Sequence, residues 1–498
     1  MPTSFAPSRW LKLSAGVAVI ITLGLPAAHL ARTAAQDNAT VQPVPVGQID
    51  DASRLNAAAV HSVWMVPAAT EAAEAQLVEL LATARRERLP VSIAGARHSM
   101  GGHTIAPGGI VVDMRPFRAM SLNADQSVLT VQAGALWSEV IPFLDAHGRS
   151  VAIMQSDSSF SVGGSLSVNA HGWQAKRPPV SSSVKSFRLL KADGSIVRCS
   201  RQHNAELFSA VLGGYGLFGI ILDAELWTVA NEWYEVERHV ASADELARAF
   251  ERQVTAEPAS QMAFGRLRVT EVGFLDDALL TVYSRTDRSE PLPPLTESAL
   301  DPLRRVIFRG SVGTDYGKRL RWNLESALGE SIGERFVSRN QLLQSDVAVY
   351  ANRSDRSTDI LHEYFVPPEQ LTSFLALARE IIPRHEPDLL NVTLRDVRAD
   401  EDTMLRYADR DLIAVVMFFN HARTAAADAN MQAMTRELID ASLDVGGRYY
   451  LPYRLHATQE QFEAAYPQAQ AFAALKRLHD PDGLFTNHFY LKYLSHRG

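Results

Sequence analysis

The sequence predicts an α+β protein with two domains, and three observations lead to this prediction. Short apolar runs alternate with amphipathic segments and Gly-rich loops through residues 55–231, which is typical of mixed helix and sheet around a ligand. Residues 232–470 contain strand-like runs such as 265–272 and 278–283, which favour an antiparallel sheet. The chain has 498 residues, too many for one ordinary core. We therefore expect a ligand-binding domain followed by a sheet-based second domain.

The overall charge argues against nucleic acid as a partner. The chain has 49 basic and 56 acidic residues and a net charge of −7, so no strongly basic field is present to hold phosphates. A small polar substrate is easier to reconcile with this balance. Cys199 is the only cysteine, so no intrachain disulfide can form. It lies in the strand-like run 195–200, which argues against a catalytic thiol.

The first 36 residues are expected to lie outside the fold. Arg9 and Lys12 precede an apolar run over residues 13–25, and small residues follow it. This order is typical of a secretory signal peptide, with Thr33-Ala34-Ala35 as the candidate cleavage site. An uncut segment over residues 13–31 would be just long enough for a membrane anchor. We therefore expect an exported protein, periplasmic or extracellular, with a membrane tether at its N-terminus as the alternative to cleavage and a polar linker over residues 37–54.

The first domain is predicted to open with alternating strands and helices. Residues 71–88 place Leu77, Leu80, Leu81 and Ala84 on one face of an amphipathic helix, and basic residues end it, which suits the helix dipole. Strands are expected at residues 60–66, 91–94, 110–113, 129–132 and 151–154, with a helix at 137–147. In the second domain, we expect helices at 368–382 and 425–443 to pack on the sheet, and residues 287–303 to form an exposed loop.

Two Gly-rich segments are the candidate ligand loops. The first, after the strand at 91–94, reads Gly-Ala-Arg-His-Ser-Met-Gly-Gly from Gly95 to Gly102. Glycine lets a backbone approach a ligand closely and aim successive N–H groups at an anion. The second segment, residues 155–172, is dense in serine and glycine and suits a loop that donates hydrogen bonds to a pyrophosphate. His98 and His103 have no carboxylate or cysteine partner at metal spacing, so no metal site is expected.

A third Gly-rich segment looks like a nucleotide fingerprint but has the wrong context. Gly214-Tyr-Gly-Leu-Phe-Gly219 fits Gly-x-Gly-x-x-Gly, which binds NAD when it follows a strand and opens a helix. Here a predicted helix at 206–212 precedes the glycines and a predicted strand at 220–226 follows them, so we reject the NAD interpretation. No Gly-x-Ser-x-Gly elbow is present, which argues against a serine hydrolase.

These segments together resemble a known family of flavoproteins. The run from Gly95 to Met114 is similar to the FAD-binding loop of the vanillyl-alcohol-oxidase-type (PCMH-type) flavoproteins, most of all the cytokinin dehydrogenases. Its Gly-x-Arg-His-Ser core also resembles alditol and aldonolactone oxidases. The resemblance implies a two-domain PCMH-type fold with a discontinuous FAD domain and an antiparallel-sheet substrate (cap) domain. It also implies that His98 bonds covalently to the flavin.

Two further matches follow in the family's order. Val-Gly-Gly-x-Leu-Ser with a later Asn-Ala matches residues 162–170, and Glu-Leu-Phe with Val-Leu-Gly-Gly-x-Gly matches residues 206–216. Three matches in order over about 130 residues make the FAD assignment specific. The residues that the resemblance implies for FAD binding are Gly95, Ala96, Arg97, His98, Ser99, Gly102, Ser158, Gly163, Gly164, Ser167, Asn169, Gly172, Gly214, Gly219, Ile220 and Asn487.

Two candidates for substrate chemistry come from the same resemblance. In cytokinin dehydrogenases, the acid before the Gly-Gly pair takes a proton from the substrate amine, and Asp157 is the nearest equivalent, with spacing that departs by one residue. A loop aspartate that caps a turn is the alternative. In alditol oxidases, a strand with Glu-x-Arg contacts substrate and flavin. Arg395 matches its Arg, but Thr393 stands where the Glu would be.

The C-terminal segment resembles the end of aldonolactone oxidases. Residues 449–467 and 476–487 carry the likeness, and the matching polar positions hold Tyr453, Arg454 and His456, with no lysine. Tyr453 is the candidate acid/base partner of a substrate hydroxyl, and His456 is the alternative base. Arg395 or Arg454 would stabilise charge on the flavin. The other interpretations are an interface aromatic for Tyr453 and ion pairs for the arginines. Residues 471–498 are expected to return to the FAD domain.

The sequence therefore predicts an exported FAD-dependent oxidoreductase. A small-molecule CH–OH donor such as a polyol, sugar or aldonolactone would give a hydride to flavin N5, and O2 or another acceptor would take the electrons. A CH–NH dehydrogenase and an electron carrier without turnover are the alternatives. A second covalent flavin link is excluded, because no cysteine lies near residues 155–172.

Overall fold

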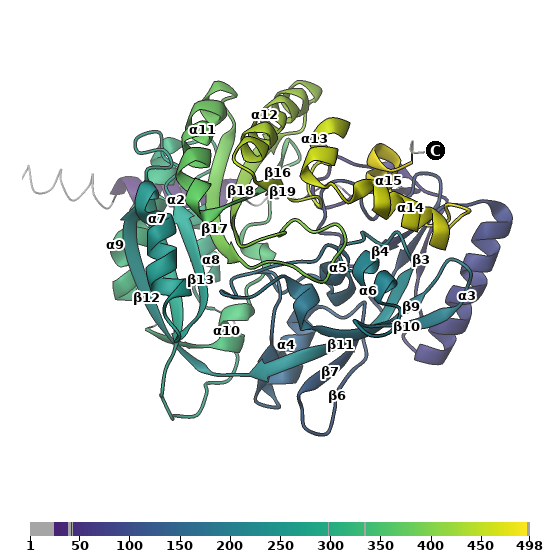
Figure 1. Ribbon diagram of the computed structural model, residues 1–498. Helices are drawn as coiled ribbons and strands as arrows, with labels where there is room; N and C mark the ends of the chain where they lie inside the picture. The colour runs from purple at the N-terminus through teal and green to yellow at the C-terminus, as the bar shows by residue number, and fades with distance from the viewer. Residues whose placement is uncertain (1–23, 38–40, 42, 297, 333–334, 496–498) are drawn as a thin grey trace, which may run out of the picture.

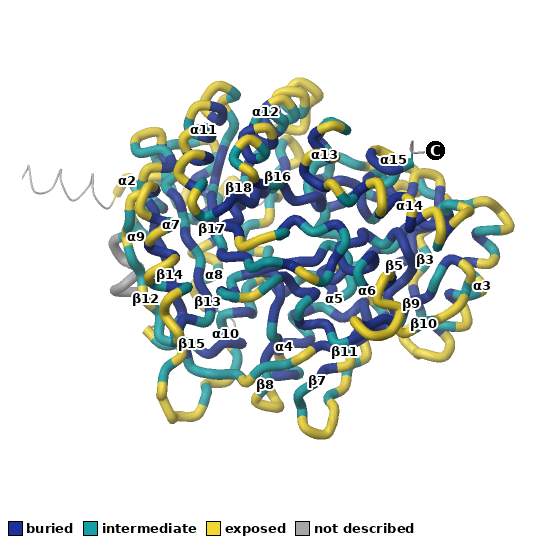
Figure 2. The backbone as a smooth tube through the Cα atoms, viewed as in Figure 1, coloured by how far each residue is buried: buried dark blue, intermediate teal, exposed yellow. Residues whose placement is uncertain are grey.

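The computed structural model describes residues 24–37, 41, 43–296, 298–332 and 335–495. It confirms the α+β class and the antiparallel sheet of the second domain (Figure 1). The chain passes from the smaller sheets to the largest one between strands β11 (Ile220–Ala230) and β12 (Trp233–Ser242). Buried residues run through both halves, and most exposed ones lie on outer loops and helices (Figure 2).

Two sheets build the N-terminal half. A three-stranded parallel sheet has the order β3-β5-β4, and a second sheet has the order β10-β9-β11-β7-β6, with β8 pairing β11. Parallel strands need a crossover, which helix α3 (Thr70–Glu87) supplies. The strand bounds are β3 Ser62–Met65, β4 Val91–Ala94, β5 Ile110–Asp113, β6 Met120–Leu122, β7 Val128–Gln132, β8 Arg149–Val151, β9 Val184–Leu190 and β10 Ile196–Cys199. A short pair, β1 Gln48–Ile49 and β2 Ala58–Ala59, precedes them.

An eight-stranded antiparallel sheet forms the second half. Its order is β15-β12-β14-β13-β17-β18-β16-β19. The remaining bounds are β13 Ser260–Leu267, β14 Asp277–Arg285, β15 Phe336–Ser338, β16 Ser357–Val366, β17 Asp388–Val397, β18 Leu412–Ala422 and β19 Arg448–Tyr449. Helices α7 (Ala243–Phe250), α11 (Leu371–Arg384) and α12 (Ala425–Asp444) cover one face (Figure 1). The other face is therefore free to line a cavity.

The remaining helices vary in length and frame these sheets. They are α4 Trp137–Asp145, α5 Val162–Ser167, α6 Ala205–Val211, α8 Asp301–Arg309, α9 Asp315–Ile332, α10 Arg339–Leu343, α13 Gln459–Ala465, α14 Ala469–His479 and α15 His488–Tyr493. Single turns lie at η2 Val180–Ser183, η3 Glu251–Thr255, η4 Val347–Val349 and η5 Pro368–Gln370. The first strands of the ligand domain are where the sequence predicts them, with β4 and β5 matching to the residue.

Three predicted elements are wrong in extent. The segment 155–172 is not all loop, because Val162 and Leu166 are buried one helical turn apart and Ser165 N–H donates to Ser161 O at 3.0 Å, which starts α5. The strand predicted at 151–154 ends at Val151. There the Arg339 guanidinium donates hydrogen bonds to the carbonyl oxygens of Val151 and Ala152, which are then not available to a neighbouring strand. The strand predicted at 265–272 ends at Leu267, because residues 268–277 turn back into β14.

The segment expected to be a leader contains an ordered helix in its second part. Helix α2 (Leu25–Gln36) contacts α8, and the His29 ring nitrogen lies 2.9 Å from Gly310 O. Asp37, next in sequence, pairs with Arg305 at 2.6 Å. The first part of the predicted leader, residues 1–23, lies outside the described residues. No helix in the described part of the chain is long and apolar enough to cross a membrane.

The C-terminus returns to the ligand domain and supports its first loop. Val91 of β4 donates to Leu484 O at 2.7 Å and accepts from Thr486 N–H at 2.9 Å, so residues 484–486 lie along β4. Asp480 shapes this return by accepting the N–H groups of Leu484 and Phe485 at 2.9 and 2.8 Å. Its carboxylate also pairs with Lys476, and both side chains are 1% exposed.

Lys476→Met is expected to lower the free energy of unfolding by about 3–5 kcal/mol, because it leaves the Asp480 carboxylate buried without its cation. Urea unfolding followed by fluorescence checks this. Arg384→Met is the matched control, since its pair with Glu437 is exposed and its loss costs about 1 kcal/mol or less. Equal losses in the two variants would contradict the anchoring role of the Lys476–Asp480 pair.

Candidate active site

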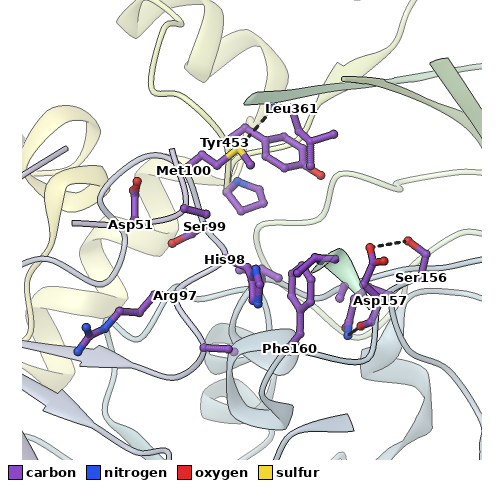
Figure 3. A pocket seen from close by; sticks show the side chains of 18 of the residues that line it. Asp51, Arg97, His98, Ser99, Met100, Ser156, Asp157, Phe160, Leu361 and Tyr453 are labelled. Atoms are coloured by element: carbon purple, nitrogen blue, oxygen red, sulfur yellow. Dashed lines mark hydrogen bonds between the residues drawn. The ribbon is translucent and has the colours of Figure 1, made fainter. Parts of the chain in front are cut away.

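A cavity of about 590 Å³ lies between the Gly-rich loops and the eight-stranded sheet, within the size range of small-molecule and cofactor sites. Three parts of the chain line it: residues 95–100, residues 155–171 and the uncovered face of the sheet. Tyr450 and Tyr453, from the C-terminal segment, complete the wall. In the close-up, His98 and Tyr453 lie on opposite sides of the same space (Figure 3).

The pleat of the sheet decides which side chains reach the cavity. Thr393 of β17 pairs with Arg266 of β13 and with Val416 of β18, which in turn pairs with Glu363 of β16. All four residues line the cavity, as residues in one cross-strand row share a face. The intervening residues face the other way. His362, next to Glu363, reaches Thr435 of α12 at 3.3 Å.

The first Gly-rich loop brings His98 into the cavity wall. β4 leads into this loop, and its last residue, Ala94, accepts a hydrogen bond from Met114 N–H at 2.9 Å. The His98 ring stacks on Phe160 with centroids 4.0 Å apart and an interplanar angle of 16°. Its Nε2 lies 3.3 Å from Ser159 O. Burial lowers the pKa of His98 below its ordinary value, so the ring is neutral at neutral pH.

Close packing requires glycine at one position in each of the two ligand loops. A Cβ added at Gly95 would lie 1.9 Å from Ser161 Oγ, and one at Gly163 would lie 2.7 Å from Ala133 Cβ. Ser161 Oγ accepts from Ala96 N–H at 3.3 Å and thereby ties the loops together. Because these glycines have no side chain, a ligand can lie directly against the backbone of the cavity wall.

Several polar atoms on the first loop have no partner among the described residues. They are Arg97 Nε, Ser99 Oγ and Thr104 Oγ1, all buried. Their residues line the cavity. Buried polar groups are nearly always hydrogen-bonded, so these atoms indicate a polar ligand. Glycine-lined walls, unpartnered donors and aromatic rings together fit a long dinucleotide such as FAD.

Tyr453 is part of a buried chain of three polar side chains. Its hydroxyl donates to Glu363 Oε2 at 3.0 Å, and His171 Nε2 lies 2.5 Å from Glu363 Oε1. Burial acts to raise the pKa of Glu363, but His171, Arg395 and the Tyr453 hydroxyl together hold it below its ordinary value. Burial and the Glu363 carboxylate raise the pKa of Tyr453 well above its ordinary value. At neutral pH, Glu363 is ionised and Tyr453 is a neutral phenol.

Arg395 and Asp157 line the cavity beside this chain. The Arg395 guanidinium donates to Ser156 Oγ at 3.1 Å and to His171 O at 3.4 Å. Burial raises the pKa of Asp157 to about 6, and Arg395 opposes the rise. Asp157 therefore titrates close to neutral pH, which suits a group that exchanges protons.

Two predicted catalytic residues do not line the cavity. Arg454 donates to Asn56 Oδ1 at 2.9 Å and to Asp428 Oδ1 at 3.0 Å. His456 Nδ1 lies 2.9 Å from Thr435 Oγ1, and burial lowers the His456 pKa to about 4. Both side chains point toward α12, because the chain turns after Tyr453. Arg454 forms an ion pair with Asp428 there.

The residues predicted to bind the cofactor fall into two groups. Those that line the cavity are Gly95, Ala96, Arg97, His98, Ser99, Gly163, Gly164, Ser167 and Gly219. Those that do not are Gly102, Ser158, Asn169, Gly172, Gly214, Ile220 and Asn487. In this second group, Asn169 donates to Asp400 at 2.9 Å, and Asn487 donates to His103 O and Tyr215 O at 2.9 Å each. These two side chains hold the loops in place behind the cavity.

Sequence reasoning missed Glu363 and His171. Glu363 carries a readable signal, because it is an acid at the centre of the apolar run 360–366, and a buried acid in a strand is seldom unpaired. His171 lies within the second Gly-rich segment, but nothing local pairs it with a residue 192 positions later. Phe160, Trp173 and Tyr215, which also line the cavity, were likewise not singled out.

Comparisons with known proteins agree with this site. Residues 69–200 match the family described as FAD binding domain, and residues 314–494 match the family described as D-arabinono-1,4-lactone oxidase. L-gulonolactone oxidase of Mus musculus is 30% identical over 441 residues, which cover 82% of this chain and 91% of that protein. Cytokinin dehydrogenase 6 of Oryza sativa subsp. japonica is 32% identical over 226 residues, 44% of this chain and 42% of that one. The second match thus spans less than half of either protein.

Gly95→Ala is expected to weaken FAD binding about tenfold, equivalent to about 1.4 kcal/mol. The added Cβ forces Ser161 to move away from the Ala96 N–H and changes the cavity wall. The measurement is the ratio of visible flavin absorbance to protein absorbance after purification. Gly148→Ala is the control for backbone strain away from the cavity, because Gly148 is exposed with a φ of +66° and an added Cβ meets no atom within 4 Å. Equal flavin content in the two variants would argue against the glycine-lined wall as the FAD site.

Proposed function

The chain belongs to the family of FAD-dependent oxidoreductases that includes L-gulonolactone oxidase, and from this we propose that it oxidises the CH–OH group of an aldonolactone, a related sugar or a polyol. The observation that carries the choice of donor is the C-terminal half, which matches the D-arabinono-1,4-lactone oxidase family over residues 314–494. That half supplies the sheet face and the tyrosines of the cavity wall.

The chain's own side chains suit this donor. When bound, FAD supplies the acceptor for the hydride that leaves the donor carbon. The sheet face and Tyr453 line the cavity in which the substrate would lie. The Tyr453 phenol already donates its proton to Glu363, so its oxygen keeps lone pairs that accept from a substrate hydroxyl. The Arg395 guanidinium stabilises negative charge that develops on the substrate oxygen.

A CH–NH donor is the second candidate, and Asp157 favours it. Its carboxyl lines the cavity with a pKa of about 6, and a base near neutral pH suits removal of a proton from an amine. The first domain also matches the cytokinin dehydrogenases. Anaerobic mixing with aldonolactones, sugars, polyols and amines separates the two candidates. Loss of visible flavin absorbance with lactones or polyols supports the proposal, and loss with amines alone contradicts it.

Readmission of air in the same experiment identifies the electron acceptor. The relatives include both L-gulonolactone oxidase and L-galactono-1,4-lactone dehydrogenase 2. Recovery of the flavin absorbance within a turnover time would identify O2 as the acceptor. Slow recovery of the flavin absorbance would indicate that a molecule other than O2 accepts the electrons. No loss with any donor, together with normal reduction by dithionite, would favour an electron carrier.

We also propose that the protein is exported and that its N-terminus is a cleaved leader or a membrane tether. The support is the order of Arg9, Lys12 and the apolar run over residues 13–25. The candidate cleavage site at residues 33–35 lies within α2. Cleavage there would detach most of this helix, including His29, from α8 and leave Asp37 paired with Arg305.

A covalent bond between His98 and the flavin is part of the proposal. The neutral His98 ring lines the cavity and is held by Phe160 and Ser159. Acid precipitation of the wild-type protein is expected to leave the yellow colour in the pellet, and His98→Ala is expected to release it to the supernatant. His147→Ala, on an exposed turn, should behave as wild type. Free flavin in the wild-type supernatant would contradict the covalent bond.

A further inference from the structure

A buried carboxylate lies directly behind Tyr453 in the cavity wall. The Glu363 side chain is 1% exposed and lies at the centre of β16. Both of its oxygens have partners: Oε2 accepts from the Tyr453 hydroxyl at 3.0 Å, and Oε1 lies 2.5 Å from His171 Nε2. We propose that Glu363 is the final acceptor of the substrate's hydroxyl proton, which reaches it through Tyr453. This inference rests on the proposed oxidation of a CH–OH donor.

The fold explains why this carboxylate is at the cavity and not in the core. Glu363 shares a cross-strand row with Val416, Thr393 and Arg266, and all four residues line the cavity. An ionised carboxylate in a core costs several kcal/mol unless it is paired and hydrogen-bonded. A purely structural Glu would be more simply replaced by an apolar residue. Its place on the cavity face, joined to a cavity-lining phenol, indicates a role in the chemistry.

Tyr453 cannot be the final proton acceptor at neutral pH. Its pKa is raised well above the ordinary value, so it is already protonated and has no free site for another proton. It can take the substrate's proton only if its own proton leaves at the same time. Its hydroxyl hydrogen already points to Glu363 Oε2. The charged or titratable groups that face Glu363 are His171, Arg395 and the tyrosines Tyr407, Tyr450, Tyr453 and Tyr466.

The proton transfer is balanced by the substrate hydroxyl, Tyr453 and Glu363. The substrate O–H bond breaks, and a new O–H bond forms on Tyr453 Oη. The original Tyr453 O–H bond breaks, and its proton forms an O–H bond on Glu363 Oε2, which changes the carboxylate to a carboxylic acid. The electron pair left on the substrate oxygen forms the C=O double bond as the hydride departs from the carbon to the FAD acceptor. Tyr453 is a neutral phenol before and after the step.

His171 acts as a positioning residue for the carboxylate. Its Nε2 holds Glu363 Oε1, while its Nδ1 is buried without a partner among the described residues. Held in this way, Glu363 turns its other oxygen to Tyr453. The ring thus orients the carboxylate.

The experiment compares Glu363→Gln, Tyr453→Phe and the double variant. An amide keeps the shape of Glu363 and still accepts the Tyr453 hydrogen bond, but it does not take a proton. We expect each single variant to slow substrate-dependent loss of flavin absorbance about 10²–10⁴-fold, the usual range for a lost proton acceptor. The double variant should be no slower than the slower single variant, because both changes interrupt one path.

Glu437→Gln is the matched control. Its carboxylate lies 2.9 Å from His385 Nε2, so it also belongs to a carboxylate–imidazole pair, but on the surface. The rate of substrate-dependent loss of flavin absorbance in Glu437→Gln should stay within about twofold of wild type, since exposed ion pairs contribute little to stability. Thermal midpoint, flavin content and reduction by dithionite establish that each variant is folded and loaded. If Glu363→Gln does not fold, Glu363→Asp replaces it in the same cycle, because a carboxylate one methylene shorter no longer reaches the Tyr453 hydroxyl and interrupts the same path.

The pH profile separates Glu363 from Asp157. Glu363 stays ionised to low pH, because its pKa is held below the ordinary value, so kcat/KM should be level from pH 8 down to pH 5. If Asp157 were the acceptor, protonation below about pH 6 would lower kcat/KM tenfold per pH unit, and Asp157→Asn would remove that slope. Such a profile would overturn the proposal.

The remaining outcomes are equally decisive. A Glu363→Gln rate within about threefold of wild type, or losses that multiply in the double variant, would overturn the proton path while leaving the proposed function intact. Failure of every CH–OH donor to reduce the wild-type protein is a different result, since it would contradict the proposed function itself.

Discussion

The two-residue pleat of the eight-stranded sheet is the constraint on which the site depends. Successive residues of β16 alternate between the helix layer and the cavity, so His362 meets Thr435 of α12 while Glu363 meets Tyr453. A shift of one residue in register would exchange these two faces. The pairing of Glu363 with Val416, and of Val416 with Thr393, therefore decides which polar groups can reach a substrate. The long apolar strand β18, buried on both faces, holds that register.

The second requirement is the return of the C-terminus to the first domain. Residues 484–486 lie along β4, and Met100 N–H, within the first ligand loop, donates to Pro452 O at 2.8 Å. The same segment thus supports the cofactor loop and carries Tyr453 to the substrate side of the cavity. The two domains are joined here by a segment that also lines the cavity. A substitution in this segment is therefore expected to affect both the cofactor loop and the position of Tyr453.

Much of the cofactor half could be predicted from the sequence, because its signals are local. β4 and β5 match their predicted ranges, and nine of the predicted cofactor residues line the cavity. The glycines carry this information, since close packing requires them at Gly95 and Gly163. Of the seven predicted residues that do not line the cavity, Gly102, Ser158, Asn169 and Gly172 lie in the two ligand loops, and a motif alone does not say which side of a loop faces the ligand. α5 was missed because serine and glycine are poor helix formers, and burial of Val162 and Leu166 outweighs their preference.

The sequence by itself determined the α+β class, the FAD loops and the candidates Tyr453, Arg395 and Asp157, because each depends on residues close together in the chain. Only the tertiary structure decided which polar side chains share the cavity. Tyr453 lines the cavity, whereas the side chains of its neighbours Arg454 and His456 contact residues of α12. The tertiary structure also joined Tyr453 to Glu363 and His171, residues 90 and 282 positions away. Such contacts follow from strand order and register across the whole sheet, and no local pattern encodes them.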